Sequence, residues 1–358
     1  MVQQQTDLLN EIMAEAFERG ATDIYLLPGE PVAYRIDGQL VRSEEEALSG
    51  QTIKEMAIAA VGEEDVEKLG RTRPGIIRSG CSIPGVADGR LTIAKALGQC
   101  TISIRLFPST IPSPEEIRLP QTIVDLSEQK SGIIVFGGET GSGKTTAALS
   151  LLDFINSQRA VHICTVEAPV VARLTPKKAV VQQREVGMDV PDGSAGVLAA
   201  MTQGADVIFV AELRTADDVM AALTAADAGH LVITTVHGAP PQMVVENMRQ
   251  AFPEDEWAQV SALLARNLLV VTSQLLLERK DGNGRLAVYD LFVPDEQIRN
   301  MIEHGANFHR PRNPDPAVYR DAKDEIKQLL EEGLISEDIA NNGLGRLRSA
   351  YYSYAHKD

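Results

Sequence analysis

The sequence predicts an α/β protein built as two domains, a smaller α+β domain followed by a larger domain around a parallel sheet. Three observations support this prediction. The chain has 358 residues, which is long for a single hydrophobic core. A proline-rich stretch at residues 108–118 divides it. Beyond that stretch, apolar strand patterns alternate with helical patterns, as they do in parallel α/β sheets.

Helical and alternating patterns follow one another in the first domain, which we place at residues 1–107. Apolar residues recur at helical spacing over residues 9–17 and stop at Gly20, which predicts an amphipathic helix. Alternating runs then predict a small antiparallel sheet, interrupted by one further helix. The alternating runs lie at 22–27, 32–36 and 76–107, and the helix lies at 52–61.

A stiff linker is predicted at residues 108–118, since Pro108, Pro112 and Pro114 favour an extended chain. The second domain is placed at residues 119–305. Its expected parallel strands are the apolar runs at 132–136, 161–166, 207–211 and 231–236. A C-terminal tail at 306–358 is expected to be helical, with a helix at 322–332, and to be loosely packed and partly mobile.

Charge and cysteine content restrict the function classes. The formal net charge is −16, so neither nucleic acid nor an anionic membrane surface is expected as a direct partner. Cys81, Cys100 and Cys164 lie far apart, which favours a reduced, cytoplasmic setting without a disulfide framework or zinc site. No apolar run approaches the roughly 18 residues of a membrane span, and the first residues lack a basic stretch. We therefore expect neither export nor insertion.

Residues 137–146, Gly-Gly-Glu-Thr-Gly-Ser-Gly-Lys-Thr-Thr, stand between an apolar strand run and a helical run. They fit the pattern G-x-x-x-x-G-K-[ST], whose glycines let backbone N–H groups wrap phosphate oxygens at a helix N-terminus. We therefore expect ATP here, with Lys144 on the β- and γ-phosphates and the Thr145 hydroxyl on Mg²⁺. The residues expected to bind the nucleotide are Gly138, Thr140, Gly141, Ser142, Gly143, Lys144, Thr145 and Thr146.

An acidic residue, Glu212, ends a second apolar run at residues 205–211. In P-loop ATPases an acid at this place orients the attacking water or holds Mg²⁺. We expect Glu212 to be catalytic, as a base that positions the water. The alternative interpretation is a solvated carboxylate at a strand end.

Several short segments resemble the type II/IV secretion ATPase superfamily, and within it the PilT-like pilus-retraction ATPases. The segments stand in the family's order, from the first helix to about residue 305. They are Glu167-Ala168-Pro169, Gln183-Arg184-Glu185-Val186-Gly187, Ala211-Glu212-Leu213-Arg214 and the stretch from Gly229-His230 to His237. Two further elements, Arg35-Ile36-Asp37-Gly38 and Ile298-Arg299-Asn300-Met301-Ile302, resemble elements of PilT itself.

This resemblance implies a homo-hexamer whose subunits carry a PAS-like N-terminal domain and a RecA-like ATPase domain. ATP would be held between the two domains and a neighbouring subunit. The resemblance implies a catalytic role for Glu167, and for Arg90 and Arg105 as arginines that reach the phosphates from the N-terminal domain. It places His230 in the nucleotide pocket and gives His237 a catalytic contact there, although hydrogen-bonded core histidines fit both positions equally well.

The implied function is a cytoplasmic ATPase that retracts type IV pili and drives twitching motility. Such a motor would be peripheral at the inner face of the inner membrane, held by a platform protein, and a paralogous ATPase would be a further partner. The extension and secretion ATPases of the superfamily carry a four-cysteine zinc insert, which three scattered cysteines cannot supply.

Departures from the family pattern keep other functions open. The family has the sequence E-D-P-I-E where this chain has Glu167-Ala168-Pro169-Val170-Val171. In addition, Leu198 and Thr202 replace two arginines of the family pattern. Loss of charge around a phosphate site weakens electrostatic catalysis, so slow hydrolysis is one expectation. The alternatives are the ATPase of a Dot/Icm-like type IV secretion or conjugation system, an ATP-binding regulatory paralogue with weak hydrolysis, and a DNA-translocating RecA relative. The acidic charge counts against the last.

Overall fold

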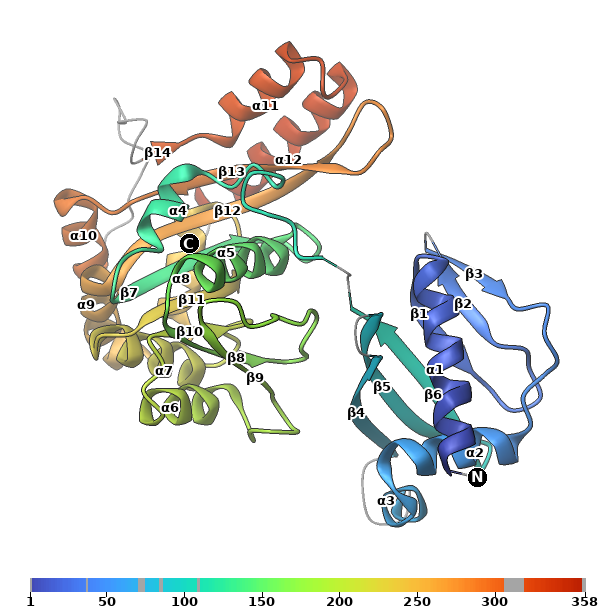
Figure 1. Ribbon diagram of the computed structural model, residues 1–358. Helices are drawn as coiled ribbons and strands as arrows, with labels where there is room; N and C mark the ends of the chain where they lie inside the picture. Colours follow the sequence, from blue (N-terminus) through green and yellow to red (C-terminus); the bar gives the residue numbers. More distant parts are fainter. Residues whose placement is uncertain are drawn as a thin grey trace. The chain divides into compact units, whose positions relative to one another are not determined.

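The computed structural model describes residues 2–36, 38–69, 75–83, 86–107, 110–305 and 319–355. The chain divides into two compact units (Figure 1). The first comprises residues 1–110 together with 171–173, and the second comprises residues 111–170 and 174–358. Pro108 and Ser109 of the predicted linker, Asp37 and the start of the predicted tail at 306–318 lie outside the described residues.

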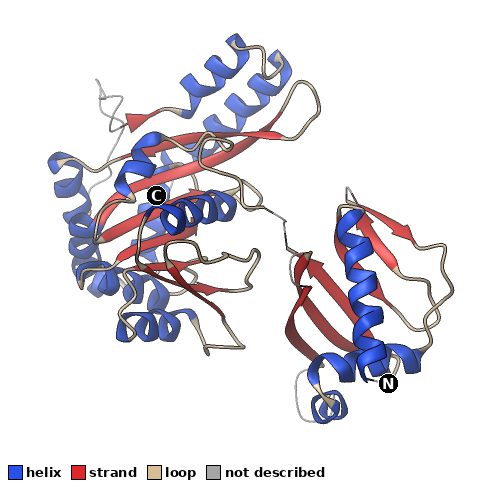
Figure 2. Ribbon diagram, viewed as in Figure 1, coloured by secondary structure: helices blue, strands red, loops and turns tan. Residues whose placement is uncertain are grey.

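A six-stranded antiparallel sheet with three helices forms the first unit (Figure 2). Its strand order is β3-β2-β1-β6-β5-β4. Successive side chains of a strand point to opposite faces of the sheet. One face of β5 and β6 therefore packs into a core shared with the helices, and the alternate side chains lie on the other face. The core residues of these two strands include Leu91, Ile93, Ile102 and Ile104. The elements are α1 Val2–Glu18, β1 Ala21–Leu26, β2 Ala33–Ile36, β3 Gln39–Arg42, α2 Gly50–Val61, α3 Glu63–Lys68, β4 Ile76–Ile83, β5 Ala87–Ala96 and β6 Gln99–Leu106.

An eight-stranded sheet in the order β14-β13-β12-β7-β11-β10-β8-β9 forms the centre of the second unit. Neighbouring strands from β12 to β9 are parallel, whereas β13 and β14 are antiparallel to their neighbours. The strands are β7 Gly132–Gly138, β8 His162–Glu167, β9 Val180–Glu185, β10 Val207–Val210, β11 Leu231–His237, β12 Leu268–Glu278, β13 Arg285–Phe292 and β14 Tyr319–Arg320.

Helices cover both faces of this sheet (Figure 1). Helices α6 to α10 share one hydrophobic cluster with strand residues such as Ile133 and Val135, and α5 packs on β7 and β11 from the opposite face. Every residue of β7 is buried, as expected for a strand covered on both faces. The helices are α4 Gln121–Leu126, α5 Lys144–Gln158, α6 Gly193–Thr202, α7 Ala216–Asp227, α8 Pro241–Gln250, α9 Trp257–Asn267 and α10 Glu296–Glu303, with a 3₁₀ turn at Glu254–Glu256.

The last two helices, α11 Ala322–Glu331 and α12 Glu337–Ala355, pack against β12 and β13. Their apolar residues form a separate cluster with the strands, and the buried Glu325 carboxylate accepts hydrogen bonds from the Tyr289 backbone N–H (2.8 Å) and from Arg320 (2.6 Å). The Tyr351 hydroxyl donates to Asp290, which is also buried. The expectation of a loosely packed tail is therefore wrong for residues 319–355, because an apolar stripe on these helices covers one end of the sheet.

The structure confirms the predicted fold class, a mostly parallel α/β sheet with helices preceded by a smaller unit with an antiparallel sheet. The four predicted parallel strands are present as β7, β8, β10 and β11. Within the described ranges, no helix combines the length and apolar character needed to cross a lipid bilayer.

Candidate active site

The phosphate loop leaves β7 at Gly138 and enters α5 at Lys144. Gly138 has φ 140° and Gly143 has φ 91°, backbone conformations that side chains rarely adopt. Space excludes side chains as well. A Cβ on Gly138 would lie 2.8 Å from the Gln274 carbonyl oxygen, and one on Gly143 would lie 2.7 Å from Nε2 of Gln274. Both glycines are therefore required by the path of the loop past β12.

Lys144 begins α5 and folds back over the loop. Its ammonium group donates to the carbonyl oxygens of Gly138 and Glu139, each at 2.8 Å. Burial lowers the pKa of Lys144, while the nearby carboxylates of Glu212 and Glu139 act in the opposite direction. Glu212 is thus close enough to the phosphate loop to interact electrostatically with its lysine.

Several features of the loop fit a bound polyphosphate. No side chain in the described part of the chain caps the first turn of α5, so its backbone N–H groups are available to an anion at the positive end of the helix. The buried Ser142 hydroxyl has no hydrogen-bond partner among the described residues, as a polar group that awaits a ligand would have none. Thr145, which is half-buried, and Thr146, which is exposed, follow Lys144 on the same turn. Thr140 and Gly141 form the exposed tip of the loop.

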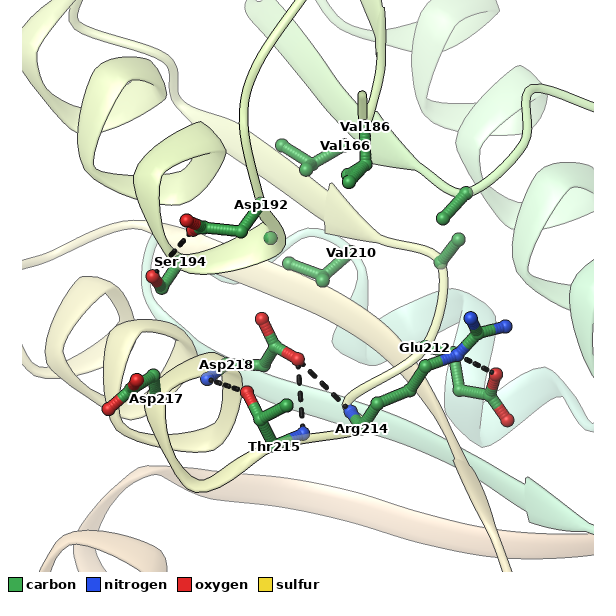
Figure 3. A pocket seen from close by; sticks show the side chains of 13 residues that line it. Val166, Val186, Asp192, Ser194, Val210, Glu212, Arg214, Thr215, Asp217 and Asp218 are labelled. Atoms are coloured by element: carbon green, nitrogen blue, oxygen red, sulfur yellow. Dashed lines mark hydrogen bonds and ion pairs between the residues drawn. The ribbon is translucent and has the colours of Figure 1, made fainter. Parts of the chain in front are cut away.

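Glu212 follows β10 and lines a cavity of about 330 Å³, which we call the acidic cavity (Figure 3). Four carboxylates line it, those of Asp192, Glu212, Asp217 and Asp218, together with one guanidinium, that of Arg214. The Nε atom of Arg214 lies 2.7 Å from Oε2 of Glu212. About one third of the Glu212 side chain remains exposed, since its relative accessibility is 34%.

The backbone after Glu212 is fixed by the start of α7. Thr215 and Asp218 form a capping box, in which the Thr215 hydroxyl accepts from the Asp218 N–H and the Asp218 carboxylate accepts from the Thr215 N–H. The same carboxylate accepts from the Arg214 N–H at 3.3 Å (Figure 3). Glu212 therefore projects from a short segment held between β10 and a capped helix.

Glu167, the last residue of β8, is fully buried. Its Oε1 accepts hydrogen bonds from the Thr165 hydroxyl at 2.6 Å and from Gln183 at 3.1 Å. Glu167 and Glu212 both stand at the carboxyl ends of parallel strands, where the phosphate loop also lies. Their exposure differs, and only Glu212 is open to solvent.

The two predicted histidines lie at opposite ends of β11. His237 is exposed at the carboxyl end, where it pairs in register with Gly138 of the phosphate loop. His230 precedes the strand, and its Nδ1 lies 2.6 Å from the Ala205 carbonyl oxygen. The strand rise of about 3.3 Å per residue separates them by roughly 20 Å. The structure thus brings His237 to the loop of its own chain and does not bring His230 there.

Arg90 and Arg105 lie in the first unit, opposite each other on β5 and β6. Asp23 on β1 is directly opposite Arg105, and Arg35 on β2 is opposite Asp23. The Nε atom of Arg105 donates to Oδ1 of Asp23 at 2.8 Å, and Nε of Arg35 lies 3.7 Å from Oδ2. A row of three arginines and one buried aspartate therefore crosses four strands on the face of the sheet turned away from the helices.

The sequence patterns did not identify Gln274 as a site residue. It lies on β12, paired in register with Gly138, and it is buried beside both loop glycines. Its side-chain carbonyl oxygen has no hydrogen-bond partner within the described part of the chain. A polar pair, Ser273-Gln274, inside the apolar run of β12 is the signal that marks it in the sequence.

A phosphate loop between a buried strand and a helix, with a partly exposed acid after a strand two places away in the sheet, defines a P-loop ATPase. The chain belongs to the family described as Type II/IV secretion system protein, whose profile matches residues 114–339. It is therefore a nucleotide-binding ATPase of that family.

Its relatives include pilus motors. The chain is 29% identical over 338 residues to the type IV pilus retraction ATPase PilT of Pseudomonas aeruginosa, an alignment that covers 93% of this chain and 96% of PilT. It is 29% identical to the uncharacterised protein YggR of Escherichia coli, over 85% of this chain and 91% of YggR.

Solved structures show the same fold. The crystal structure of the pilus retraction motor PilT with bound ADP superimposes with a TM-score of 0.81 at 31% identity, covering 93% of this chain and 96% of that one. The ATPase DotB of Legionella pneumophila superimposes with a TM-score of 0.80 at 23% identity, covering 96% of each chain. The second likeness shows the fold alone.

Proposed function

We propose that this chain is a subunit of a hexameric motor that couples ATP hydrolysis to the retraction of a type IV pilus. The observation that carries the proposal is the similarity to PilT, which extends over nearly the whole of both chains and includes both units. The motor would act in the cytoplasm, at the inner face of the inner membrane, through contact with a platform protein. A paralogous ATPase would be a further partner.

In this proposal the loop residues Gly138 and Thr140–Thr146, together with Gln274 of β12, bind the triphosphate. Lys144 exchanges its two carbonyl partners for β- and γ-phosphate oxygens, which are better acceptors because they are charged. The Thr145 hydroxyl would hold Mg²⁺, which would supply positive charge to neutralise the charge that develops during transfer.

Glu212 is the proposed base that orients the attacking water. It is partly exposed and it interacts electrostatically with Lys144. Glu167 is enclosed by Thr165 and Gln183, which suits a residue that fixes the end of β8 better than one that receives a proton from water. His237 is proposed to contact the nucleotide from the end of β11.

The first unit is the part of the chain that makes the proposed activity depend on a ring. Its Arg90 and Arg105 are proposed to reach the phosphates of a site completed by a neighbouring subunit. His230, which lies away from its own loop, would take part only in such a composite site. Hydrolysis should then require assembly. We expect turnover per subunit to rise steeply with protein concentration as the mass measured by light scattering approaches six subunits. Full turnover by a monomer would contradict the ring.

A second candidate function is an ATP-binding regulatory paralogue with weak hydrolysis. The observation that favours it is the loss of charge around the site, where Ala168 and Val171 replace acids and Leu198 is an exposed apolar residue on α6. Turnover by the purified ring, alone and with an active paralogue, separates the two candidates. A Dot/Icm-like secretion ATPase remains an alternative, for which the DotB likeness supplies only the fold.

The test of the proposed function begins with Lys144→Ala. Deleting the one lysine of the loop should abolish ATP binding while the fold persists, because Lys144 supplies charge rather than core packing. The matched control is Lys130→Ala, an exposed lysine before β7. ATP affinity of Lys144→Ala within about threefold of the unchanged chain would refute the phosphate-loop role.

A genetic test distinguishes a role in pilus retraction from a role in secretion or conjugation. Deletion of the gene in its source organism should abolish twitching and leave surface pili in place if the chain retracts pili. Loss of effector secretion or conjugation with normal twitching would support the Dot/Icm-like alternative instead.

A further inference from the structure

The buried carboxylate of Asp23 lies at the centre of the arginine row on the first unit's sheet, and both of its oxygens are used. Its Oδ1 accepts a hydrogen bond from Nε of Arg105 at 2.8 Å. Its Oδ2 accepts one from the Thr22 hydroxyl at 2.9 Å and lies 3.7 Å from Nε of Arg35. The side chain is only 10% exposed. The carboxylate is therefore fixed in position by its own unit.

The guanidinium of Arg35 is used within the first unit, because each of its three nitrogens has a partner there. Nε and Nη2 donate to the Tyr25 hydroxyl at 3.4 and 3.2 Å, and Nη1 donates to the Gly38 carbonyl oxygen at 3.1 Å. The group also lies over the Tyr25 ring, with Cζ 5.7 Å from the ring centroid. Arg35 thus braces β1, β2 and the turn after β2, and it stands beside the Asp23 carboxylate as it does so.

Arg105 differs from Arg35 because it is held along one edge only. Its Nε donates to Asp23, and its side chain is 59% exposed. The two terminal amino groups of this guanidinium have no hydrogen-bond partner within the described ranges, so they can donate to a second anion. Of these two arginines, Arg105 is the one presented to a ligand.

Charge along the row exceeds what one carboxylate neutralises. Arg90 stands directly opposite Arg105 on the neighbouring strand, and like charges in that arrangement repel. Three guanidinium groups therefore share Asp23, in a chain whose net charge is −16. An arginine side chain also loses considerable entropy when it is fixed in one conformation. The buried carboxylate is what offsets both costs and keeps Arg105 in one place.

We infer that Asp23 is a positioning residue for ATP hydrolysis, which holds Arg105 by its Nε edge and leaves the two amino groups to meet the transferring phosphate. Arg35 braces the carboxylate and does not itself reach phosphate. This inference rests on the proposed function, in which Arg105 acts on the phosphates, and it adds the group that orients Arg105. A guanidinium fixed in advance stabilises the developing charge better than a mobile one, since it needs no ordering when the reaction occurs.

The first experiment measures steady-state turnover and ATP binding by the full-length chain with Asp23→Asn, which keeps the size of the side chain and removes its charge. Turnover should fall about fivefold, while ATP affinity stays within about threefold because the phosphate loop supplies most of the contacts. If Asp23 were only a negative charge near the site, its removal would instead tighten the binding of a polyanion and would not slow turnover. Turnover within about twofold of the unchanged chain would overturn the positioning role.

The same sheet supplies a matched control and a test of the brace. Glu30→Gln makes an acid-to-amide change in an exposed carboxylate 3.2 Å from Arg42, and it should leave turnover and ATP affinity unchanged. Arg35→Ala should slow turnover by acting through Asp23, so adding it to Asp23→Asn should cost no more than about twofold further. Fully additive effects of the two substitutions would overturn the brace and give Arg35 a contact of its own with the phosphate.

Chemical rescue separates positioning from a loss of folding. Arg105→Ala keeps the Asp23 carboxylate, so free guanidinium ion should bind there and restore part of the turnover. Asp23→Asn/Arg105→Ala lacks this anchor and should not respond. The ion is added at millimolar concentration, far below the range that unfolds proteins, and sodium chloride at the same ionic strength controls for screening. An equal response of the two variants to guanidinium would overturn the role of Asp23.

The outcomes distinguish this inference from the proposed function. If Arg105→Ala slows turnover and Asp23→Asn does not, the positioning role alone is wrong. If the unchanged chain does not hydrolyse ATP, or if Arg105→Ala leaves turnover as it was, the proposed function of the first unit is wrong as well.

Discussion

Arg105 and Asp23 form an ion pair on the first unit's sheet, with Nε of Arg105 2.8 Å from Oδ1 of Asp23. The arginine side chain is 59% exposed and the aspartate side chain 10% exposed. The carboxylate holds one edge of the guanidinium, and the remaining N–H groups stay available to a second anion. Asp23 therefore orients an arginine that is proposed to act on phosphate.

Arg105→Ala should lower ATP turnover by at least about tenfold, because a charge that stabilises the transferring phosphoryl group is lost. ATP binding should change less than about threefold, since the phosphate loop supplies most of the contacts. The measurement is steady-state turnover with a binding isotherm. Arg42→Ala, an exposed arginine in the same sheet paired with Glu30 at 3.2 Å, is the control. Equal turnover in both variants would remove Arg105 from the mechanism.

Glu212→Gln should bind ATP and turn it over at least about tenfold more slowly, because an amide cannot accept the proton of the attacking water. Asp217→Asn makes the same carboxylate-to-amide change in the same cavity and should leave turnover within about twofold. Single-turnover hydrolysis separates binding from chemistry. If Glu167→Gln is the slower of the two glutamate variants, the base is the buried residue and the proposed assignment is wrong.

Two glycines of α12 provide a stability test of the docked tail. A Cβ on Gly343 would lie 2.9 Å from a methyl group of Leu277 and 3.1 Å from one of Ile326, whereas a Cβ on Gly345 would meet nothing within 4 Å. Gly345→Ala should stabilise the protein by about 0.5–1 kcal/mol through helix propensity. Gly343→Ala should be less stable than Gly345→Ala by about 1–2 kcal/mol because α12 must shift. Denaturant unfolding compares them, and equal midpoints would mean that α12 is loosely packed.

The cysteines should react slowly in the native protein. Burial, helped by the Asp88 carboxylate, raises the pKa of the Cys81 thiol to about 12, and burial also raises the pKa of Cys164. At pH 8 only about one molecule in ten thousand then carries the Cys81 thiolate, which is the reactive form. The rate of reaction of Cys81 with a disulfide reagent should rise about tenfold per pH unit from pH 7 to pH 9. A native thiol that reacts as fast as the unfolded chain would contradict this burial.

Local patterns were sufficient for the fold class and for part of the site. The strands β7, β8, β10 and β11 are short apolar runs bounded by polar residues, and each ends within two residues of its predicted limit. The phosphate loop was found because its glycines meet a backbone requirement that few other sequences satisfy. The sequence places Glu212 after β10 because a polar residue ends a fully apolar strand, and its catalytic role stays a prediction.

Long-range relationships were not available from the sequence. Arg346 and Glu139 are 207 residues apart, and no local pattern pairs them. His230 and His237 stand in one short segment of the sequence, yet β11 places them at opposite ends of a strand. The amphipathic stripes of α11 and α12 were present in the sequence, but the sheet surface that they cover is formed by strands that the patterns did not predict.

The packing of α12 against β12 has a consequence for substitutions that lie far from the phosphate loop in sequence. A change in the last two dozen or so described residues reaches the rim of the nucleotide loop without altering a single residue of the motif. Substitutions far from the motif in sequence can therefore change the surroundings of the loop, so the motif alone does not describe the site.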